Sequence, residues 1–262
     1  MSSFNPIEMA DEDEDEDEAV AGISVPVLAE FVAQGWITGV HRQVKSGKEA
    51  TVYCCHGEPK SGAALVAAKV YLARQTRNFK NDAVYQEGRY TADRRGRRAM
   101  ERKTTTGREM QSALWLDHEY RTLGLLHEVG ADVPRPITSG GGVILMDYVG
   151  DLEAPAPLLA HVAPEPDEAW PLFRRVMRNV ELLLACNCVH GDLSAYNMLY
   201  WEGNITIIDV PQAVDPRSNP NAHDLLARDV ENICRYFSRH GVRNDPGRIT
   251  QQLWARFMRG DL

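Results

Sequence analysis

Two short apolar segments in the second half of the chain flank a polar triplet. Residues 198–201 and 205–208 are rich in large apolar side chains, and Glu-Gly-Asn at 202–204 separates them. This pattern predicts a β-hairpin closed by a tight turn. The hairpin would return Asp209, at its end, to the side of Asn197, just before its start. We therefore expect a carboxylate and an amide to lie close together.

Apolar residues recur at helical spacing elsewhere, most clearly over residues 166–186, where they form one face. Helices are predicted at 24–35, 110–128, 166–186, 223–240 and 247–258. Apolar segments at 65–71 and 143–149 predict strands. The fold class expected from this pattern is α+β, with strands concentrated in the first half and helices in the second.

One lysine, Lys69, interrupts the predicted strand 65–71. Such a lysine is costly to bury unless it finds a partner, although it could reach solvent from an edge strand. Four carboxylates on or near the following helix are candidate partners, and spacing alone does not choose among Glu109, Asp117, Glu119 and Glu128.

The polar loop before the hairpin has a composition suited to phosphoryl transfer. His190-Gly191-Asp192 is followed by Asn197, and Asp209 comes twelve residues later. Mg²⁺ prefers hard oxygen ligands, and a further Asp can orient or deprotonate an attacking hydroxyl. Each of these residues could instead be a turn or cap residue. His190 is interpreted as a structural residue that braces the loop.

Residues 46–53, SGKEATVY, predict a small-residue turn leading into a strand. Backbone N–H groups in such a turn can face phosphate oxygens, although the segment alone is equally compatible with an ordinary β-turn.

Taken together, these segments resemble the RIO-type atypical serine/threonine protein kinases. The shared motifs are S-G-K-E-A-x-V-Y at 46–53, A-K-V-Y at 68–71, N-F-K-N-D at 78–82, P-A-P-L-L at 155–159, V-H-G-D-L-S-x-Y-N-M-L at 189–199 and I-I-D-V-x-Q-x-V at 207–214. The resemblance implies a bilobal protein-kinase-like fold with a small β-rich N-lobe and a reduced helical C-lobe. Only 53 residues follow Asp209 and none form A-P-E, which agrees with a C-lobe that lacks an activation segment.

The resemblance also implies ATP and Mg²⁺ as cofactors, with Mn²⁺ as a substitute. It assigns Asp192 as the catalytic aspartate, Lys69 as the ATP-binding lysine with Glu119 as its partner, and Asn197 and Asp209 as metal ligands. In this family the residue at Asp209 is also associated with an aspartyl-phosphate intermediate. The implied nucleotide-binding residues are Ser46, Gly47, Lys48, Glu49, Val52, Lys69, Met146, Tyr148 and Val149.

Three positions depart from the family's usual residues, namely Gly191, Ala195 and Pro211. None of them removes a catalytic group. On the helix predicted at 223–240, Asp229 is expected either to brace the catalytic loop through backbone N–H groups or to face solvent.

Three regions are expected along the chain. Residues 1–22 contain eight consecutive acids at 11–18 and are expected to be disordered. Residues 23–147 would form the N-lobe, with a basic flexible insertion at about 74–108. Residues 148–262 would supply the hinge and the C-lobe. The basic segment 94–103 could contact RNA or a pre-ribosomal particle, or could simply be a solvated loop.

Composition adds few constraints. Five cysteines without a C-x-x-C pair indicate a reducing compartment and no zinc site. No apolar segment is long enough to cross a bilayer, so a cytoplasmic protein without membrane contact is expected. The resemblance predicts a kinase or ATPase that acts on a protein or on itself, or an ATP-switched assembly factor. The alternative is an aminoglycoside-type phosphotransferase, which also uses H-G-D-x-x-x-x-N.

Overall fold

The computed structural model describes residues 25–71 and 105–262. The predicted acidic tail and most of the predicted basic insertion therefore lie outside the described residues. The described chain opens with a 3-10 turn η1 (Pro26–Leu28) and the helix α1 (Ala29–Ala33). The backbone then turns at Gly35, whose φ of 72° favours glycine. The helix predicted at 24–35 is present but shorter.

Five antiparallel strands form one sheet in the order β1-β2-β3-β5-β4. They are β1 (Ile37–Ser46), β2 (Ala50–Gly57), β3 (Leu65–Tyr71), β4 (Pro136–Gly140) and β5 (Val143–Asp147), with the short 3-10 turn η2 (Pro59–Ser61) between β2 and β3. One face of the sheet packs against α1, where Leu28 and Phe31 meet Val66 and Leu145. The strands predicted at 65–71 and 143–149 are present as β3 and the shorter β5, and the strand predicted to follow the turn within 46–53 is β2; β1 and β4 were not predicted.

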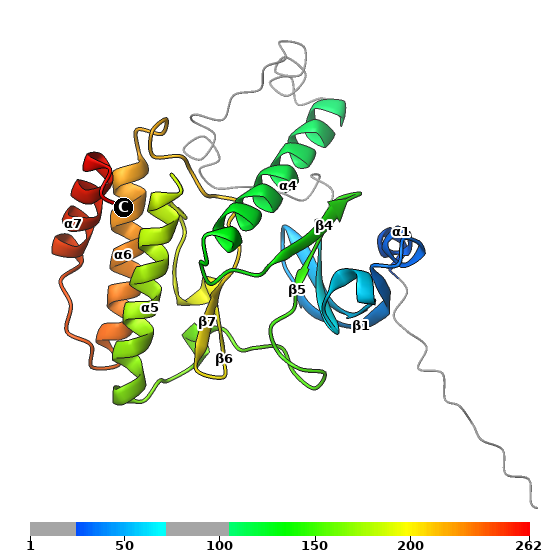
Figure 1. Cartoon of the computed structure of the whole chain (residues 1–262), viewed down its shortest axis with the longest axis horizontal. Helices are drawn as coiled ribbons and strands as arrows, with labels where there is room; N and C mark the ends of the chain where they lie inside the picture. The colour runs from blue at the N-terminus through cyan, green and yellow to red at the C-terminus, as the bar shows by residue number, and fades with distance from the viewer. Residues whose placement is uncertain (1–24, 72–104) are drawn as a thin grey trace, which may run out of the picture.

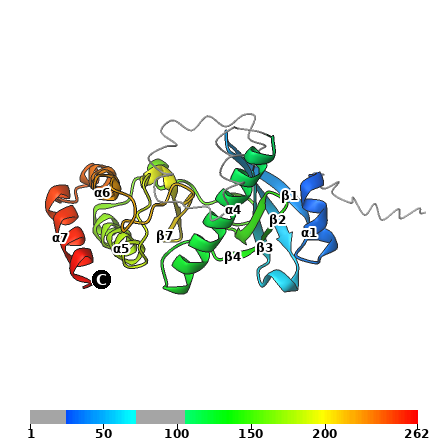
Figure 2. The same ribbon diagram turned by 90° about the horizontal axis from the view of Figure 1, so that it is seen from above.

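Helix α4 (Thr105–Glu128) lies between the sheet and the remaining helices (Figures 1 and 2). Its buried residues Leu123 and Leu126 join a large core that extends from β5 to the last helix, α7 (Pro246–Arg259). The helix predicted at 110–128 begins earlier, at Thr105, and so overlaps the end of the segment expected as an insertion at about 74–108. Propensity and apolar spacing are weakest at a helix end, which is why the pattern placed the start too late.

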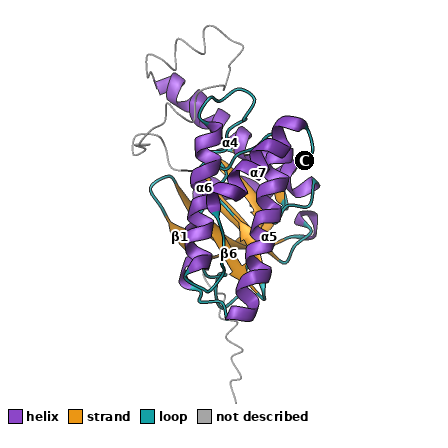
Figure 3. Ribbon diagram, turned by 90° about the vertical axis from the view of Figure 1, so that its left-hand side faces the viewer, coloured by secondary structure: helices purple, strands orange, loops and turns teal. Residues whose placement is uncertain are grey.

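The second half of the chain is mainly helical (Figure 3). Its elements are η4 (Leu159–His161), α5 (Pro166–Ala185), η5 (Ala195–Asn197), β6 (Met198–Trp201), β7 (Asn204–Ile207), α6 (Ala222–Ser238) and α7 (Pro246–Arg259). Strands β6 and β7 form the predicted hairpin. Its turn has two residues rather than three, because Glu202 and Gly203 both adopt positive φ, at 49° and 76°, as a type I′ turn requires.

Local signals explain where these helices begin and end. Pro166 occupies the first turn of α5, followed by Asp167 and Glu168, which favour the positive end of the helix dipole. The side chain of Asp245 caps α7 by accepting a hydrogen bond from the Arg248 N–H. Gly260, with φ of 73°, ends that helix.

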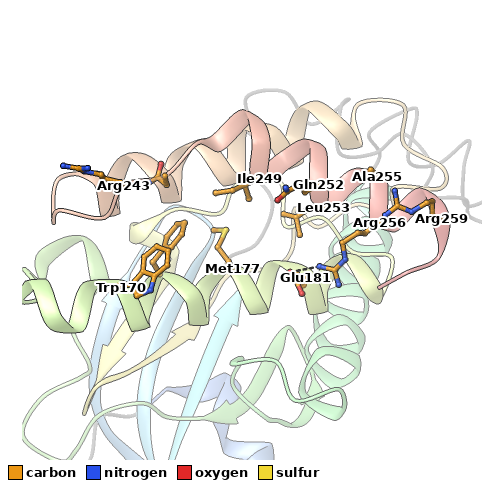
Figure 4. Close-up of a pocket in the computed structure, with 12 residues that line it drawn as sticks. Trp170, Met177, Glu181, Arg243, Ile249, Gln252, Leu253, Ala255, Arg256 and Arg259 are labelled. Atoms are coloured by element: carbon orange, nitrogen blue, oxygen red, sulfur yellow. Dashed lines mark hydrogen bonds and ion pairs between the residues drawn. The ribbon is translucent and has the colours of Figure 1, made fainter.

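A groove of about 590 Å³ lies between α5 and α7 (Figure 4). Trp170 lies at one end, and Arg256 and Arg259 lie at the other, where Arg256 pairs with Glu181 at 2.9 Å. No helix among the described residues is both long enough and apolar enough to cross a membrane.

Candidate active site

Lys69 on β3 forms ion pairs with two carboxylates, one on helix α4 and one just after the β6–β7 hairpin. Its ammonium group donates to Glu119 Oε1 of α4 at 2.7 Å and to Asp209 Oδ1, just beyond the hairpin, at 2.8 Å. The lysine lies on β3, with its side chain 14% exposed, and Glu119 is 1% exposed. Of the candidate partners, the structure selects Glu119, whereas Asp117 pairs with Arg121 on the helix surface. The predicted pairing of Lys69 with Glu119 is confirmed.

The charges of this triad depend on one another. Burial alone would lower the pKa of Lys69, but Asp209 and Glu119 outweigh burial and raise it, so the lysine keeps its charge. The Lys69 ammonium in turn lowers the pKa of Asp209, which stays ionised. Burial raises the pKa of Glu119, and Lys69 opposes that shift. A fixed cation therefore lies beside an anion that is 46% exposed and open to a ligand.

The catalytic loop and the end of the hairpin are tied together, as the sequence predicts. Asn197 Nδ2 donates to the Asp192 backbone oxygen at 2.7 Å and lies 3.3 Å from Asp192 Oδ2. The Ile208 N–H donates to the Asn197 carbonyl at 2.9 Å. A ring nitrogen of His190 lies 3.3 Å from the Ile208 carbonyl. His190 is buried and burial lowers its pKa, so the ring is neutral and braces the loop.

Asp229 binds backbone N–H groups of the polar loop that contains Asp192. This residue of α6 is 2% exposed, and its two oxygens accept hydrogen bonds from the N–H groups of Gly191 and Leu193, both at 2.8 Å. Asn232, one turn further along α6, donates to the Leu193 carbonyl at 3.2 Å. Burial raises the pKa of Asp229 to about 7, against the effect of the two N–H donors. Of the two alternatives expected for Asp229, the structure shows the residue bound to the loop and not facing solvent.

Two site residues adopt the left-handed backbone conformation. Gly191 has φ of 81° and Asp209 has φ of 68°. At Gly191 a side chain would be strained, which explains why glycine suits this loop. Asp209 carries that strain itself, and its neighbours on both sides, Ile208 and Val210, are held by the hairpin contact and by the core.

The predicted phosphate loop connects β1 to β2. Ser46, Gly47 and Lys48 are exposed and Glu49 is half-buried. The Gly47 N–H closes the turn by donating to the Ala50 carbonyl at 2.9 Å. Val52 stands directly opposite Lys69 in the β2–β3 register, so the loop leads to the strand that flanks the lysine.

The predicted hinge follows β5. Met146 is 8% exposed and pairs with Ala67 in the neighbouring strand, two pairs from the Lys69–Ile144 pair and therefore on the same face of the sheet as Lys69. Beyond it, the hydroxyl of Tyr148 accepts a hydrogen bond from Arg42 at 2.7 Å. The Val149 carbonyl accepts from the Ala156 N–H at 3.0 Å, so this oxygen is already engaged within the protein.

A family model described as the RIO domain matches residues 51–249. This chain belongs to the RIO domain family. The chain is 32% identical over 217 residues to the serine/threonine-protein kinase RIO1 of Caenorhabditis elegans, covering 82% of this chain and 40% of that protein. It is 30% identical over 217 residues to the RIO-type serine/threonine-protein kinase Rio1 of Haloferax volcanii, covering 82% of this chain and 69% of that protein.

Among solved structures, this RIO domain is similar to a Rio2 kinase from Chaetomium thermophilum, described as an ADP/Mg²⁺-phosphoaspartate complex. The TM-score is 0.64 at 24% identity, covering 87% of this chain and 64% of that one. The predicted bilobal kinase-like fold is thereby confirmed. The chain spans about two fifths of the length of the eukaryotic RIO1 relatives, between 36% and 41% in three of them.

Some residues that support the RIO site were not predicted. Arg175 on α5 forms a two-bonded ion pair with Asp132, at 2.8 Å for each bond, and also donates to Asn204 in the hairpin. Asn179 bonds both the backbone N–H and the carboxylate of Asp132, each at 2.6 Å. This cluster secures the segment after α4 and thereby the helix that carries Glu119. Its residues lie far apart in sequence, and no local motif signals them.

Proposed function

We propose that this RIO domain is an ATP- and Mg²⁺-dependent serine/threonine protein kinase or ATPase. The observation that carries the proposal is the placement of Lys69 between Glu119 and Asp209. A lysine held in this way presents a positive charge to nucleotide phosphates beside a carboxylate suited to a metal. The names of the relatives and the Rio2 structure with ADP and Mg²⁺ support the same function.

The donor atoms around Asp209 suit Mg²⁺. The Nδ2 group of Asn197 donates to Asp192, so the amide oxygen of Asn197 would be the atom that binds the metal, together with the Asp209 carboxylate. Carboxylate and amide oxygens are ligands that Mg²⁺ prefers, and Mn²⁺ accepts the same set. A bound Mg²⁺ would neutralise charge on the phosphates.

The other residues have separate tasks. Ser46, Gly47, Lys48, Glu49 and Val52 would cover the phosphates, and Met146, Tyr148 and Val149 would border the adenine. Asp192 would accept the proton of a serine or threonine hydroxyl. The hydroxyl oxygen then bonds to the γ-phosphorus as the bond from that phosphorus to the bridging oxygen of ADP breaks. Lys69 would contact the phosphates, and Glu119 would hold the lysine in place.

The matched pair of variants Asp209→Ala and Asp224→Ala tests this proposal. Both remove an aspartate, but Asp224 lies on the surface of α6 with its side chain 90% exposed. We expect Asp209→Ala to abolish Mg²⁺-dependent ATP turnover and autophosphorylation, and Asp224→Ala to leave both unchanged. Unchanged turnover in Asp209→Ala would exclude this site.

The label that remains after reaction with γ-labelled ATP distinguishes kinase from ATPase chemistry. An acid-stable label indicates phosphoserine or phosphothreonine. A label that is lost in acid as well as in base indicates a phospho-aspartate, formed if an Asp209 oxygen attacks the γ-phosphorus and ADP leaves. The Rio2 structure, described with phosphoaspartate, makes the second outcome a specific expectation. Wild-type protein that turns over small alcohols in place of proteins would instead favour the aminoglycoside-type alternative.

The wider role belongs to the same proposal. The chain would act in the cytoplasm, as part of pre-ribosomal particle assembly, with basic segment 94–103 contacting RNA phosphates. Copurification with pre-ribosomal particles that changes in Asp192→Ala would support this role, and the absence of any particle association in either nucleotide state would contradict it.

A further inference from the structure

One arginine on β1, Arg42, forms hydrogen bonds with the segment 151–153 that follows the predicted hinge. Arg42 Nη1 donates to the carbonyl oxygens of Leu152 and Glu153, at 2.7 and 2.6 Å. Its Nη2 donates to the Asp151 carbonyl at 3.0 Å and to the Tyr148 hydroxyl at 2.7 Å. One guanidinium group thus holds three successive carbonyls and a hinge side chain, all more than 100 residues away in sequence.

The segment that Arg42 binds forms a tight turn, which directs those carbonyl oxygens to the arginine. Asp151 Oδ1 accepts from the N–H groups of Glu153 and Ala154, at 2.8 and 2.7 Å, and the Asp151 N–H donates to the Ala154 carbonyl at 3.0 Å. Gly150 begins the turn at φ of 132°, and a Cβ there would lie 2.6 Å from the Ala154 carbonyl oxygen. With these three N–H groups bonded within the loop, the carbonyl oxygens of residues 151–153 are directed to the Arg42 guanidinium.

Arg42 is placed to connect both halves of the proposed nucleotide site. On β1 it stands four residues before Ser46, where the proposed phosphate loop begins, and opposite Cys54 of β2. Its far partners, Tyr148 and the 151–153 carbonyls, belong to the hinge and to the start of the helical half. A planar guanidinium with several donors can serve these four acceptors at once, which a lysine ammonium cannot do.

We propose that Arg42 is a positioning residue that clamps the hinge segment to β1 and thereby fixes the spacing between the phosphate loop and the adenine edge. The inference rests on the proposed nucleotide function. The consequence for binding is specific. Without the clamp, nucleotide must order Tyr148 and the 151–153 segment itself, which weakens binding. The phosphoryl-transfer residues Lys69, Asp192 and Asp209 do not contact Arg42, so the chemical step should change little.

The first arm of the test needs no nucleotide. Amide hydrogen exchange is compared in wild type, Arg42→Gln and the control Arg121→Gln, whose side chain is 77% exposed on α4. We expect the amides of Glu153 and Ala154 to exchange about tenfold faster in Arg42→Gln alone, because local opening controls their exchange. An unchanged rate at these amides, or an equal increase throughout the sheet, would overturn the clamp.

The second arm measures nucleotide binding and turnover. We expect the Kd for Mg–ADP and the KM for Mg–ATP to rise about tenfold in Arg42→Gln, while kcat changes less than about twofold. Arg42→Lys should recover only part of the affinity. Full recovery in Arg42→Lys would overturn the proposal, because a lysine cannot hold the four acceptors, and so would an unchanged Kd in Arg42→Gln. If wild type binds no Mg–ADP, the proposed function fails, whereas the exchange arm still tests the clamp.

Discussion

The buried carboxyl group of Asp229 is predicted to lower the stability of this protein as the pH rises. Its pKa is about 7 in the folded state against an ordinary 3.8. Below pH 4 both folded and unfolded chains hold the proton, and the contribution to stability is complete. Between about pH 4 and pH 7 the unfolded chain releases the proton while the folded chain retains it, so stability falls. The difference in pKa corresponds to at most about 4 kcal/mol.

Urea unfolding followed by tryptophan fluorescence, at pH values from about 5 to 8, measures this contribution in wild type and in Asp229→Asn. Because the asparagine does not titrate, the free-energy difference between the two proteins should shift in favour of the variant as the pH rises. Asp224→Asn, on the same helix but exposed, should follow wild type at every pH. If the difference in free energy of unfolding between wild type and Asp229→Asn stayed constant with pH, the reasoning would be refuted.

Three further predictions concern the same site. Lys69→Met should lower the free energy of unfolding by about 3–5 kcal/mol, because Glu119 is then buried without its cation. Adding Glu119→Leu should restore part of this loss, as measured by urea titration, and a double variant no more stable than Lys69→Met would contradict this explanation. Burial lowers the pKa of His190, so the unfolded chain takes up a proton at this residue before the folded chain does, and wild type loses stability below pH 6.5. His190→Gln should lose less free energy of unfolding over the same pH range. Equal slopes of the free energy of unfolding against pH in the two proteins would contradict this prediction. Gly191→Ala should cost about 1–2 kcal/mol in thermal unfolding because φ is 81°, and a neutral result would show that the loop can relax.

The best sequence predictions were those in which chemistry and periodicity coincide. The hairpin and the buried strand at β3 have short, strongly apolar segments, and the polar residues at their ends mark the site. Glu119 is different, because spacing left four carboxylates in competition. Only the family resemblance favoured Glu119, and the 2.7 Å bond to Lys69 confirms it.

The strands that were not predicted, β1 and β4, are the two edges of the sheet. An edge strand has fewer buried positions, and all five residues of β4 are only half-buried, whereas four of five in β5 are buried. Apolar patterning is correspondingly weak at the edges. Arg42 lies on one of these edge strands and bonds carbonyls 109 to 111 residues away, so no local pattern could have singled it out.

The arrangement of Lys69, Asp192, Asn197 and Asp209 is tested most directly by a crystal structure of this chain with Mg²⁺ and a non-hydrolysable ATP analogue. We predict a metal bound by the Asp209 carboxylate and the Asn197 amide oxygen, a phosphate beside Lys69, and the γ-phosphate facing Asp192. A nucleotide bound elsewhere, for example in the groove between α5 and α7, or a metal that contacts neither Asn197 nor Asp209, would contradict the proposed site.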